Sequence, residues 1–314
     1  MVEKIIIIGS GPAGLSAAIY ASREGFDPLI IAGSSGGGQL ELTTTVENFP
    51  GFPEGVQGPD LVNKMKIQAE KFGTRFVYDD LTDVDFTSRP LKAVAGGKTY
   101  EADSIIIATG ANAKNLGIDS ENRYIGKGVS TCGTCDGPFF KNKNVIVVGG
   151  GDTAMEDANF ITKFADTVTI VHRREEFKAS KIMQEKVFSN KKIKIIWNSE
   201  VIEILGKDKV EAVRLRNTKS GEMQDMPIDG VFVAIGHAPN TKIFNGKLKL
   251  DDAGYIITKD EVLTDIEGVY IAGDVADKIY RQAVTASASG VKCALRAREY
   301  LIDLYYKKEK ESSG

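Results

Sequence analysis

The sequence predicts an α/β protein of two domains, each built on a parallel sheet. Its 314 residues are typical of about two domains. An apolar strand, a glycine-rich turn, a helix-length segment and a second apolar strand follow one another over residues 4–32, and again over 144–172. Three more apolar runs end in a glycine or in Gly-Asp, at 104–110, 230–236 and 268–274. Strands that alternate with helices in this way form βαβ units and parallel sheets.

Both repeated segments have a glycine-rich turn between the first strand and the helix. The turn reads GSGPAG over 9–14 and GGGDTA over 149–154. The first glycine permits a tight turn, the second lets a pyrophosphate approach the backbone, and the third position must be small so that helix and strand pack closely. The helix then presents free N–H groups and its positive dipole end to the phosphates. Two such turns predict two Rossmann-like dinucleotide-binding domains.

The residues after the second strand of the later segment indicate which nucleotide binds there. An NAD site normally has an acid at this place, about 20 residues after the glycines, which binds a ribose hydroxyl. This chain instead has His172, Arg173 and Arg174, with Lys178 further along. Guanidinium groups match phosphate oxygens, so the cluster favours the 2′-phosphate of NADPH over NADH. The alternative is a solvated basic turn, because two glutamates follow directly.

The corresponding residues of the first segment, 32–39, include neither an acid nor a base. They predict a different dinucleotide, held by backbone and small side chains. Strands that end in glycine are natural places for a chain to change domain or meet a cofactor. We predict that residues 112–240 form a complete dinucleotide-binding domain inserted into the first, which comprises 1–111 and 241–314.

Charge and composition exclude several classes of protein. The chain has 43 acidic and 40 basic residues and a net charge of −3, which argues against a nucleic-acid or anionic-membrane surface. No apolar run approaches the roughly 18 residues that a membrane helix needs. A strand at 4–8 stands where a signal peptide would have its apolar segment, so we expect a cytoplasmic protein. Three cysteines are too few for a secreted disulfide framework.

Two of the three cysteines form a C-x-x-C pair, Cys132 and Cys135, with Asp136 directly after it. A zinc site needs four ligands, and Cys293 and the two histidines are scattered along the chain. Two ordinary buried thiols are a second interpretation. A redox disulfide is the favoured one, because the thiol pKa values of such a pair are readily tuned and Asp136 can exchange a proton with it. Cys293 lies in a predicted helix and is expected in the core.

Two dinucleotide sites and one redox disulfide define a route for electrons. NADPH delivers a two-electron hydride, and a disulfide also takes two electrons. A flavin can mediate between them, so we expect the glycine-rich first segment to hold FAD.

Ordered motifs along the whole chain resemble those of the low-molecular-weight thioredoxin reductases, across about residues 4–300. The matching motifs are GSGPAG at 9–14, GGQL at 37–40, ENFPGFP at 47–53, ATGA at 108–111, CGTCDG at 132–137, GGGDTAMEDA at 149–158, HRR at 172–174, IGHAPNT at 235–241 and GDVADKIYRQAVTA at 273–286. The resemblance implies an FAD domain interrupted by an NADPH domain, thioredoxin as partner, and a homodimer. It also implies that the disulfide and the nicotinamide visit the flavin alternately, by domain rotation.

The resemblance also implies roles for individual residues. Cys135 faces the flavin, Cys132 attacks the substrate disulfide, and Asp136 is the acid–base residue. The cofactor-binding residues predicted from the motifs, the glycine turns and the strand ends are Gly9, Ser10, Gly11, Pro12, Ala13, Gly14, Ala32, Gly33, Ser34, Ser35, Gly38, Gln39, Asn48, Thr109, Gly110, Gly149, Gly151, Asp152, Thr153, His172, Arg173, Arg174, Lys178, Ile235, Gly236, Gly273, Asp274, Arg281, Gln282 and Ala283.

Two features depart from the family pattern. Lys178 stands where a third arginine is usual, which loosens the expected selectivity for NADPH. The dipeptide Gly133-Thr134 between the cysteines is less usual, and we expect it to shift the disulfide potential. The alternative functions are a flavoprotein reductase of another partner, such as a glutaredoxin-like protein or a peroxiredoxin, and a non-catalytic flavin redox sensor.

Overall fold

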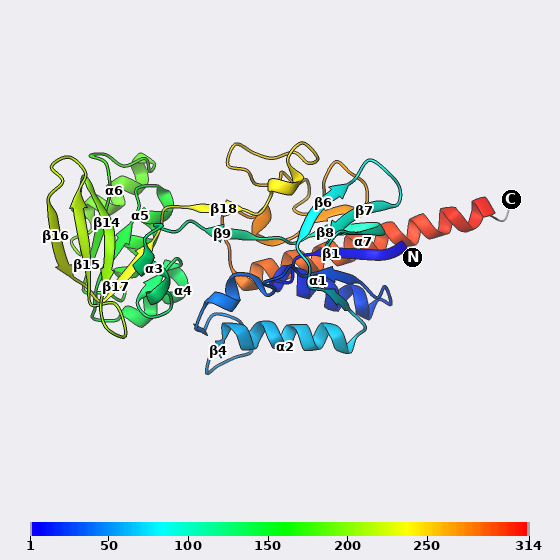
Figure 1. Ribbon diagram of the computed structural model, residues 1–314, viewed down its shortest axis with the longest axis horizontal. Helices are drawn as coiled ribbons and strands as arrows, with labels where there is room; N and C mark the ends of the chain where they lie inside the picture. Colours follow the sequence, from blue (N-terminus) through cyan, green and yellow to red (C-terminus); the bar gives the residue numbers. More distant parts are fainter. Residues whose placement is uncertain (1, 313–314) are drawn as a thin grey trace. The chain divides into compact units, whose positions relative to one another are not determined.

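The computed structural model describes residues 2–312, and the chain forms two compact units. The outer unit consists of the residues up to Asn112 and from Ala238 onward, and the inserted unit runs from Ala113 to His237 (Figure 1). The inserted unit begins at 113, where the sequence predicts 112, and ends at 237 instead of 240. The chain passes between the units in β9 (Ala111–Ala113) and β18 (His237–Pro239), which pair with each other.

The outer unit is built on a seven-stranded sheet with the order β5-β2-β1-β8-β7-β6, and β19 also pairs with β8. The neighbours β5, β2, β1 and β8 run parallel to one another, and β19 is parallel to β8. In contrast, β7 is antiparallel to both of its neighbours, β8 and β6. The strands are β1 (Val2–Ile8), β2 (Leu29–Ile31), β5 (Arg75–Val77), β6 (Leu81–Asp85), β7 (Leu91–Ala95), β8 (Lys98–Ile107) and β19 (Val269–Ile271), with a separate hairpin of β3 (Thr45–Val46) and β4 (Val56–Gln57).

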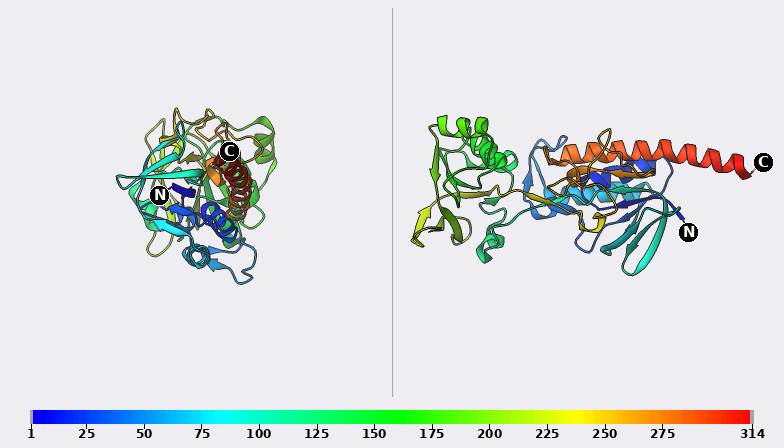
Figure 2. Two further views of the ribbon diagram at one scale, coloured as in Figure 1. Left: turned by 90° about the vertical axis from the view of Figure 1, so that its right-hand side faces the viewer. Right: turned by 90° about the horizontal axis from the view of Figure 1, so that it is seen from above.

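Three helices cover one face of this sheet. In Figures 1 and 2, α7 runs beside α1, and its last turns extend past the sheet. Alternate residues of β1 enter different cores: Ile5 and Ile7 pack with the helices, and Ile6 and Ile8 pack on the opposite face. A parallel sheet buried on both faces explains the unbroken apolar run. The helices are α1 (Pro12–Arg23), α2 (Gly58–Lys71) and α7 (Ala283–Ser312), with short 3₁₀ turns η1 (Gly38–Leu42), η3 (Lys242–Phe244) and η4 (Gly273–Val275).

Cys293 lies on α7 in the core that also contains Ile5 and Leu15, and its side chain is fully buried. Burial raises the pKa of its thiol. The prediction that Cys293 is a packing residue is confirmed.

The inserted unit has a five-stranded parallel sheet in the order β10-β17-β11-β12-β13 and a three-stranded antiparallel sheet, β14-β15-β16. Its strands are β10 (Val129–Ser130), β11 (Asn144–Val148), β12 (Thr167–Val171), β13 (Ile193–Ile196), β14 (Ser199–Leu205), β15 (Ala212–Asn217), β16 (Met223–Pro227) and β17 (Gly230–Val233). Its helices are α3 (Asp119–Tyr124), α4 (Gly133–Asp136), α5 (Asp152–Ile161) and α6 (Lys181–Ser189), with the 3₁₀ turn η2 (Gly137–Phe140).

Each unit thus contains a strand–turn–helix–strand segment on a parallel sheet, and the predicted α/β class is confirmed. Within residues 2–312, none of the helices combines the length and the apolar character that crossing a bilayer requires.

Candidate functional site

The first glycine turn joins β1 to α1 and shows why its spacing matters. A Cβ on Gly9, which has a φ of +110°, would lie 2.3 Å from the carbonyl oxygen of Ala108, at the end of β8. A Cβ on Gly14 would lie 1.9 Å from the carbonyl oxygen of Gly9. Gly11, the N-cap of α1, has only the carbonyl oxygen of Gly37 near its own Cβ position, at 3.9 Å. Gly9 and Gly14 therefore allow the turn, the strand and the helix to pack closely. Gly11 leaves open space at the helix N-terminus, where a phosphate fits.

The loop after β2 is tied to this turn by side-chain hydrogen bonds. Ser10 Oγ donates to the carbonyl oxygen of Ala32 at 3.2 Å and accepts the N–H of Gly37 at 2.9 Å. Ser34 donates its N–H, at 2.8 Å, and its hydroxyl to the carboxylate of Asp80. These hydrogen bonds lower the pKa of Asp80. The loop predicted to contact FAD is thus held from two sides.

Asp80 is a site residue that the sequence analysis missed. It follows β5, which lies beside β2 in the sheet, and the carboxyl ends of parallel strands meet at one edge. The neighbouring strand β5 is thus followed by an acid that is hydrogen-bonded to the loop after β2. Finding Asp80 would have required knowing that β2 pairs with β5, which is a long-range contact that a single sequence does not show.

Asp274 brings a buried carboxyl group to the same sheet edge, because η4 begins directly after β19. Its Oδ1 atom is buried and has no hydrogen-bond partner among residues 2–312. Burial raises the pKa of this carboxyl to about 6, to which Asp277 adds, while Arg281 acts in the opposite direction. A buried acceptor without a donor is costly, and hydroxyl groups of a bound dinucleotide would satisfy it. The residues present therefore fit FAD.

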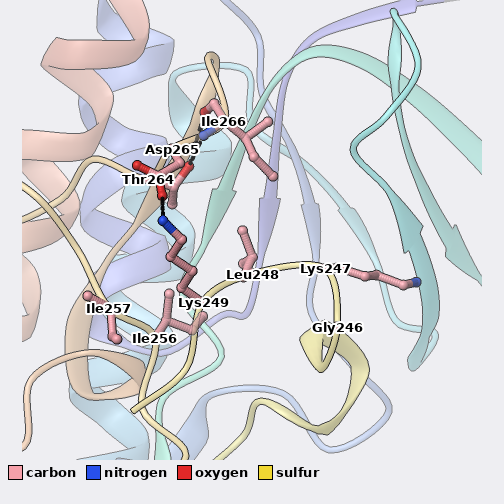
Figure 3. Close-up of a pocket in the computed structure, with 9 residues that line it drawn as sticks. All are labelled: Gly246, Lys247, Leu248, Lys249, Ile256, Ile257, Thr264, Asp265 and Ile266. Carbon is pink, nitrogen blue, oxygen red and sulfur yellow. Dashed lines mark hydrogen bonds and ion pairs between the residues drawn. The ribbon is translucent and has the colours of Figure 1, made fainter.

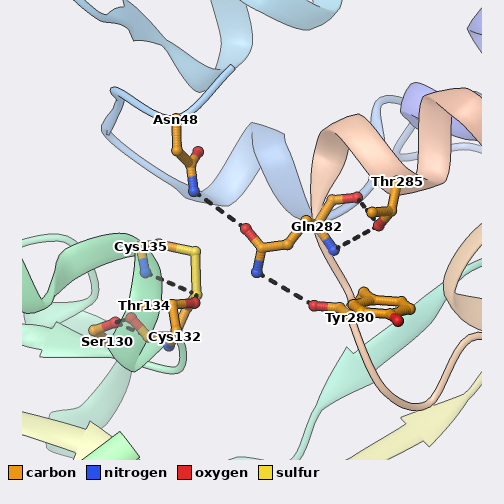
Figure 4. The surroundings of a disulfide bond; sticks show 8 residues. All are labelled: Asn48, Ser130, Cys132, Thr134, Cys135, Tyr280, Gln282 and Thr285. Atoms are coloured by element: carbon orange, nitrogen blue, oxygen red, sulfur yellow. Dashed lines mark hydrogen bonds between the residues drawn. A yellow bond between two sulfur atoms is a disulfide. The ribbon is translucent and has the colours of Figure 1, made fainter. Parts of the chain in front are cut away.

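The segment before α7 is joined to the loop over 47–53. Asn48 Nδ2 donates to Gln282 Oε1 at 3.1 Å, and Gln282 Nε2 donates to the carbonyl oxygen of Tyr280 at 3.3 Å (Figure 4). Thr285 Oγ1 donates to the carbonyl oxygen of Gln282 at 3.0 Å and so closes the first turn of α7. The structure thus brings together Asn48 and Gln282, two predicted cofactor residues that are far apart in the chain.

Gln39, Thr109 and the end of β18 also meet within the outer unit. Gln39 Nε2 donates to Asn112 Oδ1 at 3.0 Å, and Asn240 Nδ2 donates to the carbonyl oxygen of Thr109 at 2.9 Å. Thr109 Oγ1 donates to the carbonyl oxygen of Asn240 at 3.0 Å. The strand ends predicted to meet a cofactor are therefore organised by Gln39 together with two amide side chains that the sequence analysis did not select, Asn112 and Asn240.

The second glycine turn, between β11 and α5, repeats the packing of the first. A Cβ on Gly149 would lie 2.4 Å from the carbonyl oxygen of Ala234, and the small Ala154 occupies the third position. Gly151 is the N-cap of α5 and has nothing within 4 Å of its Cβ position. The open space again lies at a helix N-terminus, so this turn fits a second pyrophosphate.

His172 is not exposed with the basic residues that follow it. Its ring is buried against Gly150, contacts Phe177 and Trp197, and is hydrogen-bonded through Nε2 to the carbonyl oxygen of Glu176 at 3.0 Å. Burial lowers the pKa of His172, and the neighbouring arginines lower it further. His172 therefore has the surroundings of a packing residue of the loop.

Arg173, Arg174 and Lys178 are exposed on the loop after β12. The loop is attached to the glycine turn, because the N–H groups of Lys178 and Ala179 both donate to the carbonyl oxygen of Gly150, at 2.8 and 3.1 Å. The next residue, Ser180, donates its N–H and hydroxyl to the carboxylate of Asp152 at 2.8 and 2.9 Å. Three cations are thus held near a phosphate-binding turn, as a 2′-phosphate site requires.

Cys132 and Cys135 form a disulfide with a Cα–Cα distance of 5.3 Å. Cys132 is the N-cap of α4, and its Sγ accepts the N–H of Cys135 at 3.2 Å (Figure 4). Thr134 Oγ1 lies 3.4 Å from the same sulfur. Backbone and hydroxyl groups therefore surround Cys132 Sγ, and a hydrogen bond to sulfur favours the thiolate once the disulfide is opened.

Asp136 ends α4 and is half-buried. Burial raises the pKa of its carboxyl, and a hydrogen bond with Ser130 opposes that shift. Ser130 Oγ also accepts the N–H of Cys132 at 3.0 Å, so one hydroxyl joins the proposed acid to the cysteine turn. Sequence reasoning missed Ser130, which has no motif of its own.

A separate cavity of about 290 Å³ lies in the outer unit, between the segments 246–249, 256–257 and 264–266 (Figure 3). Leu248, Ile256 and Ile266 are among its lining residues, and Lys249 pairs with Asp265 at its rim. None of the predicted site residues lines it, so we assign it no part in the chemistry.

The fold and the site together define a dinucleotide-binding disulfide oxidoreductase. Comparison with known proteins agrees: the family model described as pyridine nucleotide-disulphide oxidoreductase matches residues 3–290. The chain belongs to this family.

Several curated relatives that resemble the chain are named thioredoxin reductase. The one from Rickettsia conorii is 53% identical over 303 residues, which cover 95% of this chain and 98% of the relative. The one from Streptomyces clavuligerus is 48% identical over 307 residues, covering 96% and 95%. The solved thioredoxin reductase from Giardia duodenalis has a TM-score of 0.91 and 43% identity, covering 95% of this chain and 98% of its own. The predicted resemblance to thioredoxin reductases is confirmed.

Proposed function

We propose that this protein is an FAD-dependent disulfide reductase that passes electrons from NADPH, through the flavin and the Cys132–Cys135 disulfide, to thioredoxin or a thioredoxin-like protein. The observation that supports this most is the C-x-x-C disulfide in the same unit as a phosphate-binding turn with an attached basic loop. The relatives named thioredoxin reductase support the choice of partner.

The residues that would hold the cofactors follow from the two turns. FAD would lie on the turn at 9–14, with the carboxyl group of Asp274 accepting from its hydroxyl groups. NADPH would lie on the turn at 149–153, with the exposed Arg173, Arg174 and Lys178 on its 2′-phosphate. When bound, this pair supplies a hydride from NADPH and a flavin that relays two electrons to a disulfide.

The protein's own chemistry begins at Cys132. Its thiolate attacks one sulfur of the partner disulfide, forms a mixed disulfide and releases one partner thiolate. The Cys135 thiolate then attacks Cys132 Sγ, which restores the Cys132–Cys135 disulfide and releases the second partner thiolate. Two electrons pass to the partner, and its two thiolates take up two protons.

Asp136 is suited to supply one of these protons. Burial raises the pKa of its carboxyl, so it retains a proton at a higher pH than an exposed aspartate would. The hydroxyl of Ser130 links it to the cysteine turn. We assign Asp136 the acid–base role.

The organisation of the complete enzyme is also a proposal. We propose that the outer unit binds FAD, that the inserted unit binds NADPH, and that domain rotation brings disulfide and nicotinamide to the flavin in turn. We further propose a homodimer located in the cytoplasm. The similarity to thioredoxin reductases and a redox pair suited to a reducing compartment support these assignments.

An anaerobic titration of the purified holoenzyme tests the function. NADPH should bleach the flavin absorbance, and oxidised thioredoxin should restore it through repeated cycles. Cys135→Ser should abolish turnover with thioredoxin, whereas the matched variant Cys293→Ser changes only a buried packing residue. A protein that is bleached once but never cycles with any disulfide substrate would instead be a redox sensor, and the proposal would be wrong.

A further inference from the structure

Gly133, between the two cysteines, lies against a side chain from a different helix. A Cβ on Gly133 would lie 2.5 Å from Oδ1 and 2.7 Å from Cγ of Asp157, which belongs to α5. Gly133 is buried, and a side chain at this position would have to displace the carboxyl group of Asp157. The unusual glycine of the C-x-x-C turn is therefore matched to the carboxyl group of Asp157.

We propose that Asp157 is a positioning residue for the redox pair: its carboxylate, admitted by Gly133, disfavours negative charge on Cys132 and makes the dithiol a stronger reductant. This inference rests on the proposed function, because it concerns the same cysteine pair. It assigns the pair a second carboxyl group besides Asp136.

The direction in which the carboxylate shifts the dithiol–disulfide equilibrium follows from the charges of the two redox states. The disulfide is neutral, whereas reduction adds two electrons and two protons and yields two thiols, one of which can ionise. A thiolate at Cys132 is repelled by a nearby carboxylate. The carboxylate therefore destabilises the reduced, ionised state relative to the disulfide, and electrons leave the dithiol more readily. The effect must grow with pH, because it requires the thiolate.

The other groups around the cysteine turn can be separated from Asp157, whose carboxyl group lies against Gly133. The element α4 contributes Asp136, and β10 contributes the neutral Ser130. The 3₁₀ turn η2, which packs on α4, has no titratable residue, and α5 contributes Asp157. The N–H of Cys135 donates to Cys132 Sγ and acts in the opposite direction, in favour of the thiolate. The adjacent Glu156 is exposed and provides a matched acid on the same helix.

The decisive experiment compares the holoenzyme variants Asp157→Asn and Glu156→Gln with the unchanged protein. The dithiol–disulfide equilibrium of Cys132 and Cys135 is measured by thiol trapping in dithiothreitol redox buffers at pH 6 and pH 8.5. For Asp157→Asn we expect the dithiol to be favoured about tenfold more at the higher pH, which is a potential about 30 mV less negative. At pH 6 the change should vanish, and Glu156→Gln should change neither value. A shift that is absent, independent of pH or shared by both variants overturns the proposal.

A second measurement isolates Cys132. In Cys135→Ser the alkylation rate of Cys132 by iodoacetamide reports its thiolate fraction, since Cys293 is fully buried. Adding Asp157→Asn should move the midpoint of this pH profile about one unit lower, which corresponds to a tenfold change in ionisation. Gly133→Ala should act in the same direction, because its methyl group must displace the carboxylate. A pH midpoint that stays in place in both variants contradicts the proposal.

These measurements do not require thioredoxin. Failure of the enzyme to cycle with thioredoxin would overturn the proposed function and leave the charge effect of Asp157 standing. If the enzyme turns over normally with thioredoxin but Asp157→Asn leaves the disulfide potential unchanged, the proposed function stands and the proposed effect of Asp157 is wrong.

Discussion

The imidazole ring of His172 occupies the space in which a side chain of residue 150 would lie: a Cβ on Gly150 would be 2.2 Å from Cε1 of that ring. The ring is fixed in place by Phe177, by Trp197 and by its hydrogen bond to Glu176. The middle glycine of the GGGD turn and the first residue of the basic loop are therefore matched to each other. This contact, with the backbone hydrogen bonds to Gly150, makes the turn and the loop one structural piece.

Gly150→Ala should destabilise the inserted unit, because its methyl group overpacks a buried ring that cannot move away. We expect a loss of about 2 kcal/mol in the free energy of unfolding, measured by urea denaturation. Gly151→Ala is the control, since nothing lies within 4 Å of that Cβ position; it should leave stability unchanged and raise the KM for NADPH. The double variant Gly150→Ala/His172→Ala should recover part of the loss. Equal destabilisation by both single alanines would contradict the proposed match.

Asp274→Asn should have opposite effects on the apoprotein and the holoenzyme. The folded-state pKa of this carboxyl is raised from 3.8 to about 6, so the native state favours the proton, and stability falls as pH rises from about 4 to 6. At pH 7.5 the asparagine variant of the FAD-free protein should be more stable by about 3 kcal/mol, with no difference near pH 3.5. Its FAD affinity should fall, because a charged acceptor is lost. Thermal unfolding with and without FAD checks both, and the exposed Asp252→Asn is the control.

Asp80→Asn should weaken FAD retention without changing the fold, because it loosens Ser34 in the loop that borders the first glycine turn. The measurement is the dissociation constant of FAD from the reconstituted apoprotein. Ser34→Ala should have a similar effect, and the double variant should add little, since both changes remove one shared contact. Asp79→Asn, at the adjacent position, is the matched control because its carboxyl lies against Gly96 instead. Fully additive effects of the first two variants would count against the coupling.

Lys178→Arg should increase selectivity for NADPH. A guanidinium can contact a phosphate with two parallel hydrogen bonds where an ammonium makes a point contact. The N–H of residue 178, which bonds to Gly150, is retained in the variant, so the loop should keep its place. We expect the ratio of kcat/KM for NADPH to that for NADH to rise about fivefold, by analogy with the greater strength of bidentate pairs. The exposed Lys181→Arg, on α6, should leave the ratio unchanged. A ratio that rises equally in both variants would show that the change does not depend on residue 178 and would contradict the prediction.

Much of the site could be predicted from the sequence because its parts are local in the chain. The turns at 9–14 and 149–154 show their function through glycine spacing, and the C-x-x-C pair closes within one helical turn. The apolar runs predicted the parallel strands because each strand is also a short continuous segment of the chain. The start of the inserted unit differed from the prediction by one residue, 113 against 112, and its end by three, 237 against 240, because β9 and β18 span the change of unit.

The remaining site residues depend on contacts between distant segments. Asp80 reaches Ser34 because β5 pairs with β2, and Asn48 reaches Gln282 because the loop after β3 approaches the start of α7. Sequence spacing contains no signal for either contact. His172 was grouped with the basic residues by its position and by the HRR motif, and its ring is buried, whereas Arg173 and Arg174 are exposed.

The sequence by itself determined the fold class, the two dinucleotide turns and the redox pair, since each follows from backbone requirements and side-chain chemistry within a few consecutive residues. Tertiary structure alone brought together the side chains on which our proposals rest: Asp157 against Gly133, Ser130 with Asp136, and Asp80 with Ser34. The physical reason is that electrostatic and hydrogen-bond effects depend on distances in space, and these distances are set by how strands and helices pack.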